Sequence, residues 1–236
     1  MSNKKNLPFD LIAFDADDTL WENEPLYTAS QARFAELLAD HVAYEQIQAR
    51  LYETEMRNLR LYGYGIKGFT LSMIETALEL TEQRVSGAVI QQILDLAKEQ
   101  LLAPTRLLDH VAEVVPQLAR DYRLMLLTKG DLFDQESKLA RSGLGQHFSH
   151  VEIVSDKTPA TYQAIFERLN IVPARFLMVG NSLRSDILPV TLVGARAIYI
   201  PYHSTWAHEL VHDEHDRGGY IELGSIAELP ALLGQL

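Results

Sequence analysis

The chain has 236 residues, of which 47% are hydrophobic and 22% charged, a composition typical of a globular protein and not of a disordered one. Its formal net charge of -11 repels phosphodiester backbones and argues against a nucleic-acid partner. The lack of cysteine excludes disulfides and thiolate sites and fits a cytosolic protein.

The sequence contains no segment typical of a signal region or of a membrane-spanning helix. Residues 1–8 are polar and contain no apolar signal region. No run of about 18 apolar residues occurs anywhere in the chain, as a spanning helix would need. We therefore expect a cytoplasmic protein with no membrane partner.

Short apolar segments alternate with helical patterns along most of the chain. The first expected strand, 11–14, is apolar and ends in acidic residues. Further strands are expected at 123–128, 151–154, 176–179, 197–200 and 220–223, and helices at 107–122, 132–141, 159–169, 186–192 and 225–233. This alternation predicts βαβ units and a doubly wound parallel sheet, an α/β fold. Ser225, with Glu228 three residues later, predicts a capping box for the last helix.

Residues 23–103 interrupt the alternation with four amphipathic helical patterns and no strand signal. Thr81 is the expected cap of the fourth helix. The sequence thus predicts a core formed by 1–22 and 104–236 with an inserted helical cap domain at 23–103. An insert directly after the first strand lies over the carboxyl edge of the sheet, where doubly wound folds bind ligands.

Three acidic residues follow the first expected strand within four positions. These are Asp15, Asp17 and Asp18. Like charges this close raise one another's pKa unless a cation neutralises them, and a hard divalent cation such as Mg²⁺ prefers oxygen ligands. The spacing of Asp15 and Asp17 just past a strand allows both to lie on the same side of one pocket, where one can attack while the other handles a proton.

Polar residues also follow three later strands. Thr128 and Lys129 end the second strand, Lys157 follows the third, and Asn181 and Asp186 follow the fourth. Taken alone, the signals at Thr128 and Lys157 are more typical of an ordinary turn and of a surface lysine before a helix. Because the carboxyl ends of parallel strands meet at one crevice, the four together predict a single anion-binding and cation-binding site.

Four motifs in this order resemble those of the haloacid dehalogenase (HAD) superfamily. They are DADDTL at 15–20, LLTKG at 126–130, SDKTP at 155–159 and VGNSLRSDI at 179–187. The match spans nearly the whole chain and is similar to the phosphatase branch with a helical, C1-type cap. It implies a HAD-like Rossmannoid core and a phosphoric monoester hydrolase.

The resemblance implies a role for each matching residue. Asp15 would be the nucleophile that forms an aspartyl-phosphate, and Asp17 the acid that protonates the leaving oxygen and later activates water. Thr128, Lys129 and Lys157 would bind the phosphoryl group. The chemistry of these residue types agrees, because a covalent carboxylate intermediate splits hydrolysis into two easier steps.

The resemblance also implies a Mg²⁺ site built from Asp15, the main-chain carbonyl of Asp17, and the loop that contains Asn181 and Asp186. The family usually has Asp where this chain has Asn181. An amide oxygen ligates a metal without bringing charge, so weaker Mg²⁺ binding is expected, or a direct ligand role for Asp186.

Three alternatives compete with a phosphatase. A 2-haloacid dehalogenase needs Asp15 but neither the metal nor Asp17. A phospho-accepting signalling or binding module combines similar residues, yet is about half as long and lacks a helical insert. The pattern HExxH at 208–212 matches a zinc protease motif, but it lies in a late connection and not in a central helix.

The substrate is expected to be a small phosphorylated metabolite, such as a sugar phosphate or a nucleoside monophosphate. The candidate specificity element is the loop at 62–68, which contains three glycines and two tyrosines. Within it, Lys67 is available for a second anionic group. An ordinary helix–helix connection is the competing interpretation of this loop.

Overall fold

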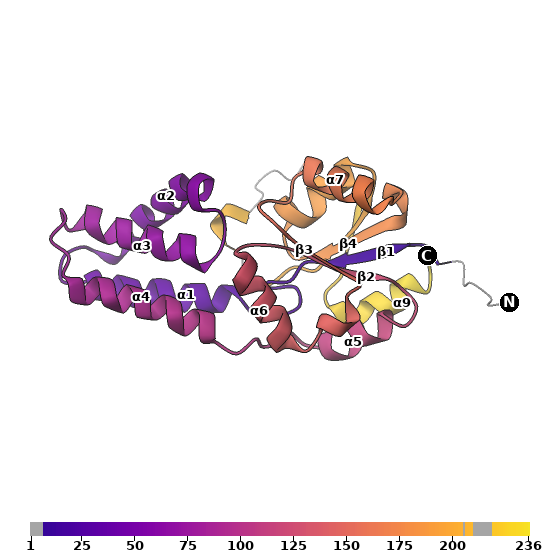
Figure 1. Ribbon diagram of the computed structural model, residues 1–236, viewed down its shortest axis with the longest axis horizontal. Helices are drawn as coiled ribbons and strands as arrows, with labels where there is room; N and C mark the ends of the chain where they lie inside the picture. Colours follow the sequence, from indigo (N-terminus) through magenta and orange to yellow (C-terminus); the bar gives the residue numbers. More distant parts are fainter. Residues whose placement is uncertain (1–6, 205, 210–218) are drawn as a thin grey trace. The chain divides into compact units, whose positions relative to one another are not determined.

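The computed structural model describes residues 7–204, 206–209 and 219–236 of the chain (Figure 1). It divides into two compact units. The first unit comprises Met1–Glu24, Thr105–Thr128 and Leu139–Leu236, and the second comprises Pro25–Pro104 and Lys129–Lys138. The domain boundaries predicted from the sequence, 1–22 with 104–236 and 23–103, remain predictions. The hydrophobic pattern gave no reason to group the segment at 129–138 with the helices.

The first unit contains a six-stranded sheet in the order β3-β2-β1-β4-β5-β6. Its strands are β1 (Leu11–Phe14), β2 (Leu124–Lys129), β3 (His150–Val154), β4 (Phe176–Gly180), β5 (Arg196–Tyr199) and β6 (Tyr220–Glu222). The pairs β1–β2, β1–β4, β4–β5 and β5–β6 are parallel. The order reverses at β1, so its carboxyl end lies at a topological switch point. The predicted doubly wound α/β sheet is confirmed.

Alternate residues of the strands pack on opposite faces of this sheet, as the pleat requires. On one face Ile12 and Phe14 pack with the helices α5 (Val111–Leu118) and α9 (Leu229–Leu233). On the other face Leu11 and Ala13 pack with α7 (Pro159–Leu169) and α8 (Leu188–Leu192). Figure 1 shows α7 on one side of the strands and α5 and α9 on the other. Strands buried on both faces explain the continuous apolar runs in the sequence.

The helix expected at 107–122 begins only at Val111, because the residues before it pair with the chain that follows β1. Glu22 N–H donates to the Arg106 carbonyl at 3.0 Å, and Leu108 N–H donates to the Leu20 carbonyl at 3.0 Å. Trp21 and Leu107 form an antiparallel bridge between these two segments. The segments that lead out of the first unit and back into it therefore run side by side.

The second unit contains α1 (Glu24–Leu38), α2 (Tyr44–Tyr62), α3 (Ile66–Leu80), α4 (Gly87–Leu102) and most of α6 (Leu132–Ser142). The apolar faces of α1 to α4 form one buried cluster, which includes Phe34, Leu38, Ile47, Leu51, Phe69, Met73 and Ile93. The four predicted helical patterns are thus four helices.

The predicted role of Thr81 is wrong, whereas the predicted capping box is present. Thr81 ends α3, and its hydroxyl accepts a hydrogen bond from Val85 N–H at 2.9 Å. Ser86 caps α4 instead, because a turn separates α3 from α4. Ser225 and Glu228 form the reciprocal pair of hydrogen bonds that defines a capping box.

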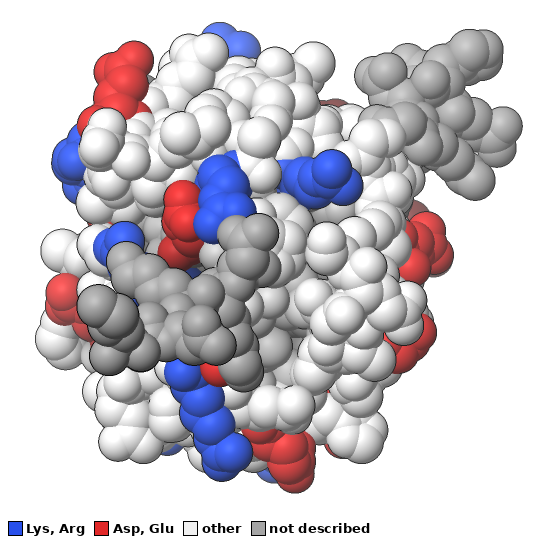
Figure 2. Space-filling view, turned by 90° about the vertical axis from the view of Figure 1, so that its right-hand side faces the viewer, with Lys and Arg blue, Asp and Glu red and all other residues white. Residues whose placement is uncertain are grey.

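Charged side chains of both signs lie among uncharged ones on the face of the molecule shown in Figure 2. Lys and Arg side chains on this face stand singly or in small groups beside Asp and Glu.

Among the described helices, none is both long enough and apolar enough to cross a membrane.

Candidate active site at the carboxyl edge of the sheet

The ends of β1 and β4 bring two of the predicted site residues, Asp15 and Asn181, together. Phe14, the last residue of β1, lies opposite Leu126 of β2 and Val179 of β4. Asp15 N–H continues the ladder by donating to the Val179 carbonyl at 2.9 Å. The carboxylate of Asp15 therefore leaves the sheet beside Gly180, at the start of the loop that carries Asn181.

Lys157 joins two of the predicted acidic residues. Its Nζ forms ion pairs with Oδ1 of Asp15 and, at 2.6 Å, with Oδ1 of Asp186. Lys157 is 3% exposed, Asp15 7% and Asp186 1%. When both carboxylates are ionised, the one ammonium between them leaves a net negative charge in this triad, which favours a further cation nearby.

Burial is the largest influence on the pKa values of Asp15 and Lys157. It raises the pKa of Asp15 to about 7, with Lys157 opposing the shift and Asp186 and Asp17 adding to it. Burial lowers the pKa of Lys157, but the charges of Asp15 and Asp186 outweigh it and leave that pKa above its usual value. Lys157 is therefore the ammonium that offsets the negative charge of Asp15.

Asn181 gathers oxygen atoms around one end of its amide. The atom of its amide that faces Thr19 lies 3.1 Å from that hydroxyl, and 3.3 Å both from Asp15 Oδ2 and from the main-chain carbonyl of Asp17. If this atom is nitrogen, it donates to these oxygens. If it is oxygen, it accepts from the Thr19 hydroxyl, and a hard cation would offset its repulsion with the oxygens of Asp15 and Asp17. A carboxylate, an amide and a carbonyl are a donor set that fits Mg²⁺.

The carboxylate of Asp186 packs against the first residues of the loop that follows β4. Its Oδ2 accepts a hydrogen bond from Ser182 N–H at 3.0 Å, and its side chain lies against Gly180, where a Cβ would overlap with the carboxylate. The chain between them forms a π-helical turn, Leu183–Ile187, a feature that often marks functional sites. Both oxygens of Asp186 are thus engaged, one by Lys157 and one by the loop.

The carboxylate of Asp17 lies against an aromatic donor. Its Oδ1 accepts a hydrogen bond from Nε1 of Trp21 at 2.7 Å. Trp21 is fully buried in the same apolar cluster as Phe14. The sequence interpretation missed this contact, although an aromatic donor four residues after Asp17 was visible in it.

Asp18 has a structural use at the start of the first helix. With a φ of 59°, it turns its carboxylate to accept hydrogen bonds from the N–H groups of Asn23 at 2.8 Å and of Glu24 at 3.0 Å. Burial raises the pKa of Asp18 to about 7, and the two N–H groups oppose that shift. Asp18, the third acidic residue of the motif, thus caps the start of α1.

The two substrate-binding candidates at the end of β2 are adjacent in the chain but fall on either side of the boundary between the two units. Thr128 is buried in the first unit. Lys129 belongs to the second unit, where its Nζ lies 4.1 Å from the centroid of the Tyr64 ring. This cation–π contact connects Lys129 to the loop at 62–68.

The HExxH pattern contributes one carboxylate to the loop after β4. Glu209 accepts hydrogen bonds from the hydroxyls of Ser182 and, at 2.6 Å, of Ser185, while Arg184 donates to the His208 carbonyl at 3.1 Å. His212 lies outside the described residues. No group of three His, Cys, Asp or Glu side chains suited to a metal occurs in the part of the chain that is described. No local signal in the sequence could have linked Glu209 to this loop.

Comparison with known proteins agrees with the fold and the motifs. A profile of haloacid dehalogenase-like hydrolases matches residues 9–190. A crystal structure of a haloacid dehalogenase-like hydrolase from Xanthomonas campestris is 38% identical, with a TM-score of 0.88 over 99% of this chain and 94% of that one. Solved 2-haloacid dehalogenases from Pseudomonas syringae and Xanthobacter autotrophicus share the fold at 20% and 16% identity.

Curated relatives are phosphatases at lower identity. The human N-acylneuraminate-9-phosphatase is 23% identical over 94% of this chain and 92% of its own length. A glyceraldehyde 3-phosphate phosphatase from Pyrococcus furiosus is 29% identical, but the match covers only 48% of this chain and 46% of that protein. With a profile match over most of its length and a closely similar solved structure, the chain belongs to the haloacid dehalogenase-like hydrolases.

Proposed function

We propose that this hydrolase is a Mg²⁺-dependent phosphomonoesterase that forms an aspartyl-phosphate on Asp15. The observation that carries the proposal is the surroundings of the Asp15 carboxylate. One of its oxygens is held by the buried ammonium of Lys157. The other lies 3.3 Å from the amide of Asn181, which also lies 3.3 Å from the main-chain carbonyl of Asp17. An anionic nucleophile needs such charge compensation to meet an anionic phosphate.

The residues divide the reaction between them. Asp15 attacks phosphorus, and Lys157 offsets the charge of the phosphoryl oxygens in the first and second steps. Asp186 keeps Lys157 in place through the 2.6 Å ion pair. Asp17 protonates the leaving oxygen and then takes a proton from the attacking water. Thr128, buried at the end of β2, supplies a hydroxyl for the phosphoryl group.

The metal would be held by Asp15, the Asp17 carbonyl and Asn181. When bound, Mg²⁺ supplies positive charge to the phosphoryl oxygens. We assign the direct ligand role to Asn181 rather than to Asp186, because both oxygens of Asp186 are already engaged by Lys157 and Ser182.

The substrate proposed is a small phosphorylated metabolite, as for the phosphatases among the relatives. The competing activity is dehalogenation, since solved dehalogenases share the fold. A panel of phosphorylated metabolites and 2-chloropropionate, each assayed with and without Mg²⁺, separates the two. Metal-dependent release of phosphate supports the proposal, and metal-independent release of chloride refutes it.

The assignment of Asn181 predicts that Asn181→Asp tightens Mg²⁺ binding. A second carboxylate at this position adds a charged ligand, and we expect the apparent Mg²⁺ affinity to rise by about tenfold. Titration of activity and of thermal stability with Mg²⁺ measures this in both proteins. Identical titration curves for the two proteins would contradict a ligand role for residue 181.

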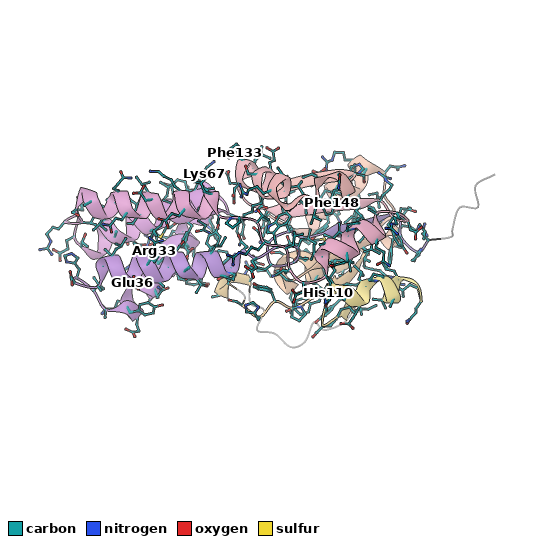
Figure 3. All side chains as sticks on the ribbon, turned by 90° about the horizontal axis from the view of Figure 1, so that it is seen from below. Arg33, Glu36, Lys67, His110, Phe133 and Phe148 are labelled. Carbon is teal, nitrogen blue, oxygen red and sulfur yellow. The ribbon has the colours of Figure 1, made fainter. Side chains whose placement is uncertain are left out.

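The proposed specificity loop predicts a change in substrate binding on Lys67→Ala. Lys67 donates to both carboxylate oxygens of Asp131 at 3.0 Å, and Asp131 caps the start of α6 by accepting from Asp134 N–H at 3.1 Å. Figure 3 shows Lys67 beside Phe133, whose ring centroid lies 6.0 Å from the ammonium. Only residues 63–65 of the expected loop lie between α2 and α3, and Lys67 belongs to the first turn of α3. Its ion pair with Asp131 therefore ties the start of α3 to the start of α6.

We expect Lys67→Ala to raise KM for phosphomonoesters by about threefold to tenfold while kcat stays unchanged, as loss of uniform binding does. Lys98→Ala is the matched control, because Lys98 is similarly exposed in the same unit and pairs with Asp95 at 2.8 Å. Steady-state kinetics on the best substrate of the panel gives both values. Equal KM values for the two variants would remove Lys67 from the substrate site.

A further inference from the structure

The indole of Trp21 is a hydrogen-bond donor fixed in place beside the proposed acid. Its Nε1 lies 2.7 Å from Oδ1 of Asp17, and its side chain is fully buried. An N–H group that donates to a carboxylate forms a charge-assisted bond, which is stronger than a neutral one.

The main chain of Trp21 is held as firmly as its side chain. Its carbonyl accepts from Asp18 N–H at 2.7 Å, and its N–H donates to the Ala16 carbonyl at 3.3 Å. It also bridges Asp17 and Leu107 on its two sides. Because the backbone and the ring of Trp21 are both fixed, the position of its N–H is fixed too. The hydrogen bond to it therefore favours one orientation of the Asp17 carboxylate.

We propose that Trp21 is a positioning residue that orients Asp17 for transfer of a proton to the leaving oxygen. The inference rests on the proposed function, in which Asp17 is the general acid. Donation to Oδ1 directs the transferable proton to Oδ2. It also reduces the rotation of the side chain, so less freedom is lost when the acid meets the leaving oxygen. Trp21 itself touches no reacting atom.

A buried tryptophan that merely satisfies its own N–H would affect folding and all substrates alike. A positioning residue for the acid affects most the substrates whose leaving group needs a proton. Phenyl phosphate has a basic leaving group, whereas para-nitrophenyl phosphate has a more acidic one that leaves with less help. The comparison uses kcat/KM, which covers the steps up to departure of the leaving group.

The test is Trp21→Phe in the full chain with Mg²⁺ present. We expect kcat/KM for phenyl phosphate to fall about tenfold further than kcat/KM for para-nitrophenyl phosphate, because the acid has lost its orientation. Trp21→Met, which also lacks the donor but fills the core differently, should show the same ratio. Phe9→Leu is the control, since Phe9 is a buried ring of the same cluster with no polar group. Its two kcat/KM values should change by one common factor.

Asp17→Asn separates failure of this inference from failure of the proposed function. If Asp17→Asn lowers both kcat/KM values by the same factor, Asp17 is not the acid, and the proposed role falls together with this inference. If Asp17→Asn discriminates between the substrates but both Trp21 variants do not, the role of Asp17 stands and only the positioning role of Trp21 is refuted.

Discussion

Asp15→Asn should abolish turnover of phosphomonoesters while the protein stays folded. An amide cannot form the acyl phosphate, so we expect kcat to fall by at least ~10⁴-fold. Stability should be kept, because burial already disfavours the charged form of Asp15, whose pKa is raised to about 7, and the amide carries no charge to desolvate. Steady-state phosphate release and urea unfolding measure the two effects.

The covalent intermediate gives an independent check on Asp15. Rapid acid quenching of the wild-type enzyme during turnover should yield a peptide phosphorylated at Asp15, identified by mass spectrometry. The same experiment with Asp17→Asn and para-nitrophenyl phosphate, whose leaving group departs with little protonation, should trap more of this species, because the second step lacks its base. Retained turnover in Asp15→Asn, or phosphate found on another residue, would refute the mechanism.

Lys157→Met should destabilise the first unit more than any other single change proposed. The substitution keeps most of the volume but leaves Asp15 and Asp186 as buried carboxylates without their cation. Breaking a buried pair in this way costs about 3–5 kcal/mol of unfolding free energy. Lys98→Met, at an exposed lysine, should cost less than about 1 kcal/mol. Urea unfolding of both variants measures the difference.

The loss in Lys157→Met should depend on pH. The pKa of Asp15 is raised from 3.8 to about 7, so its protonated form favours the folded state. That contribution is complete below the unfolded value and is lost as pH rises through the folded value. Removing Lys157 raises the folded pKa further. The deficit relative to the wild type should therefore be small at about pH 5 and large at about pH 8. A deficit that is constant over this range would contradict burial as the main cause.

The fold was readable from the sequence because both of its patterns are strong. Strands covered on both faces are continuous apolar runs, and the expected ends of β1, β4 and β5 differ from the observed ones by no more than one residue. Helices with one buried face repeat at the helical period, as in α1 to α4. The start of α5 was not readable, because residues before Val111 are held by pairing with a segment far away in the sequence.

The candidate site was readable only where local motifs follow a strand. Asp15, Lys157, Asn181 and Asp186 come together because each lies just beyond a strand end. The contact of Glu209 with Ser182 depends instead on how a late connection folds back, which no local pattern encodes. The sequence also could not decide between Asn181 and Asp186 as the metal ligand, because that choice depends on the ion pair between Asp186 and Lys157.

The pairing of Glu22 with Arg106 also bears on how chains of this kind diverge. The two ends of the intervening helical segment emerge from the sheet unit at one place, held together by main-chain hydrogen bonds that any sequence can form. Since the entropy of closing a loop grows only with the logarithm of its length, segments of other lengths can be accommodated at this junction. The inserted helices can thus be replaced during evolution by a segment of another length without a change in the strand ends that carry Asp15 and Lys157.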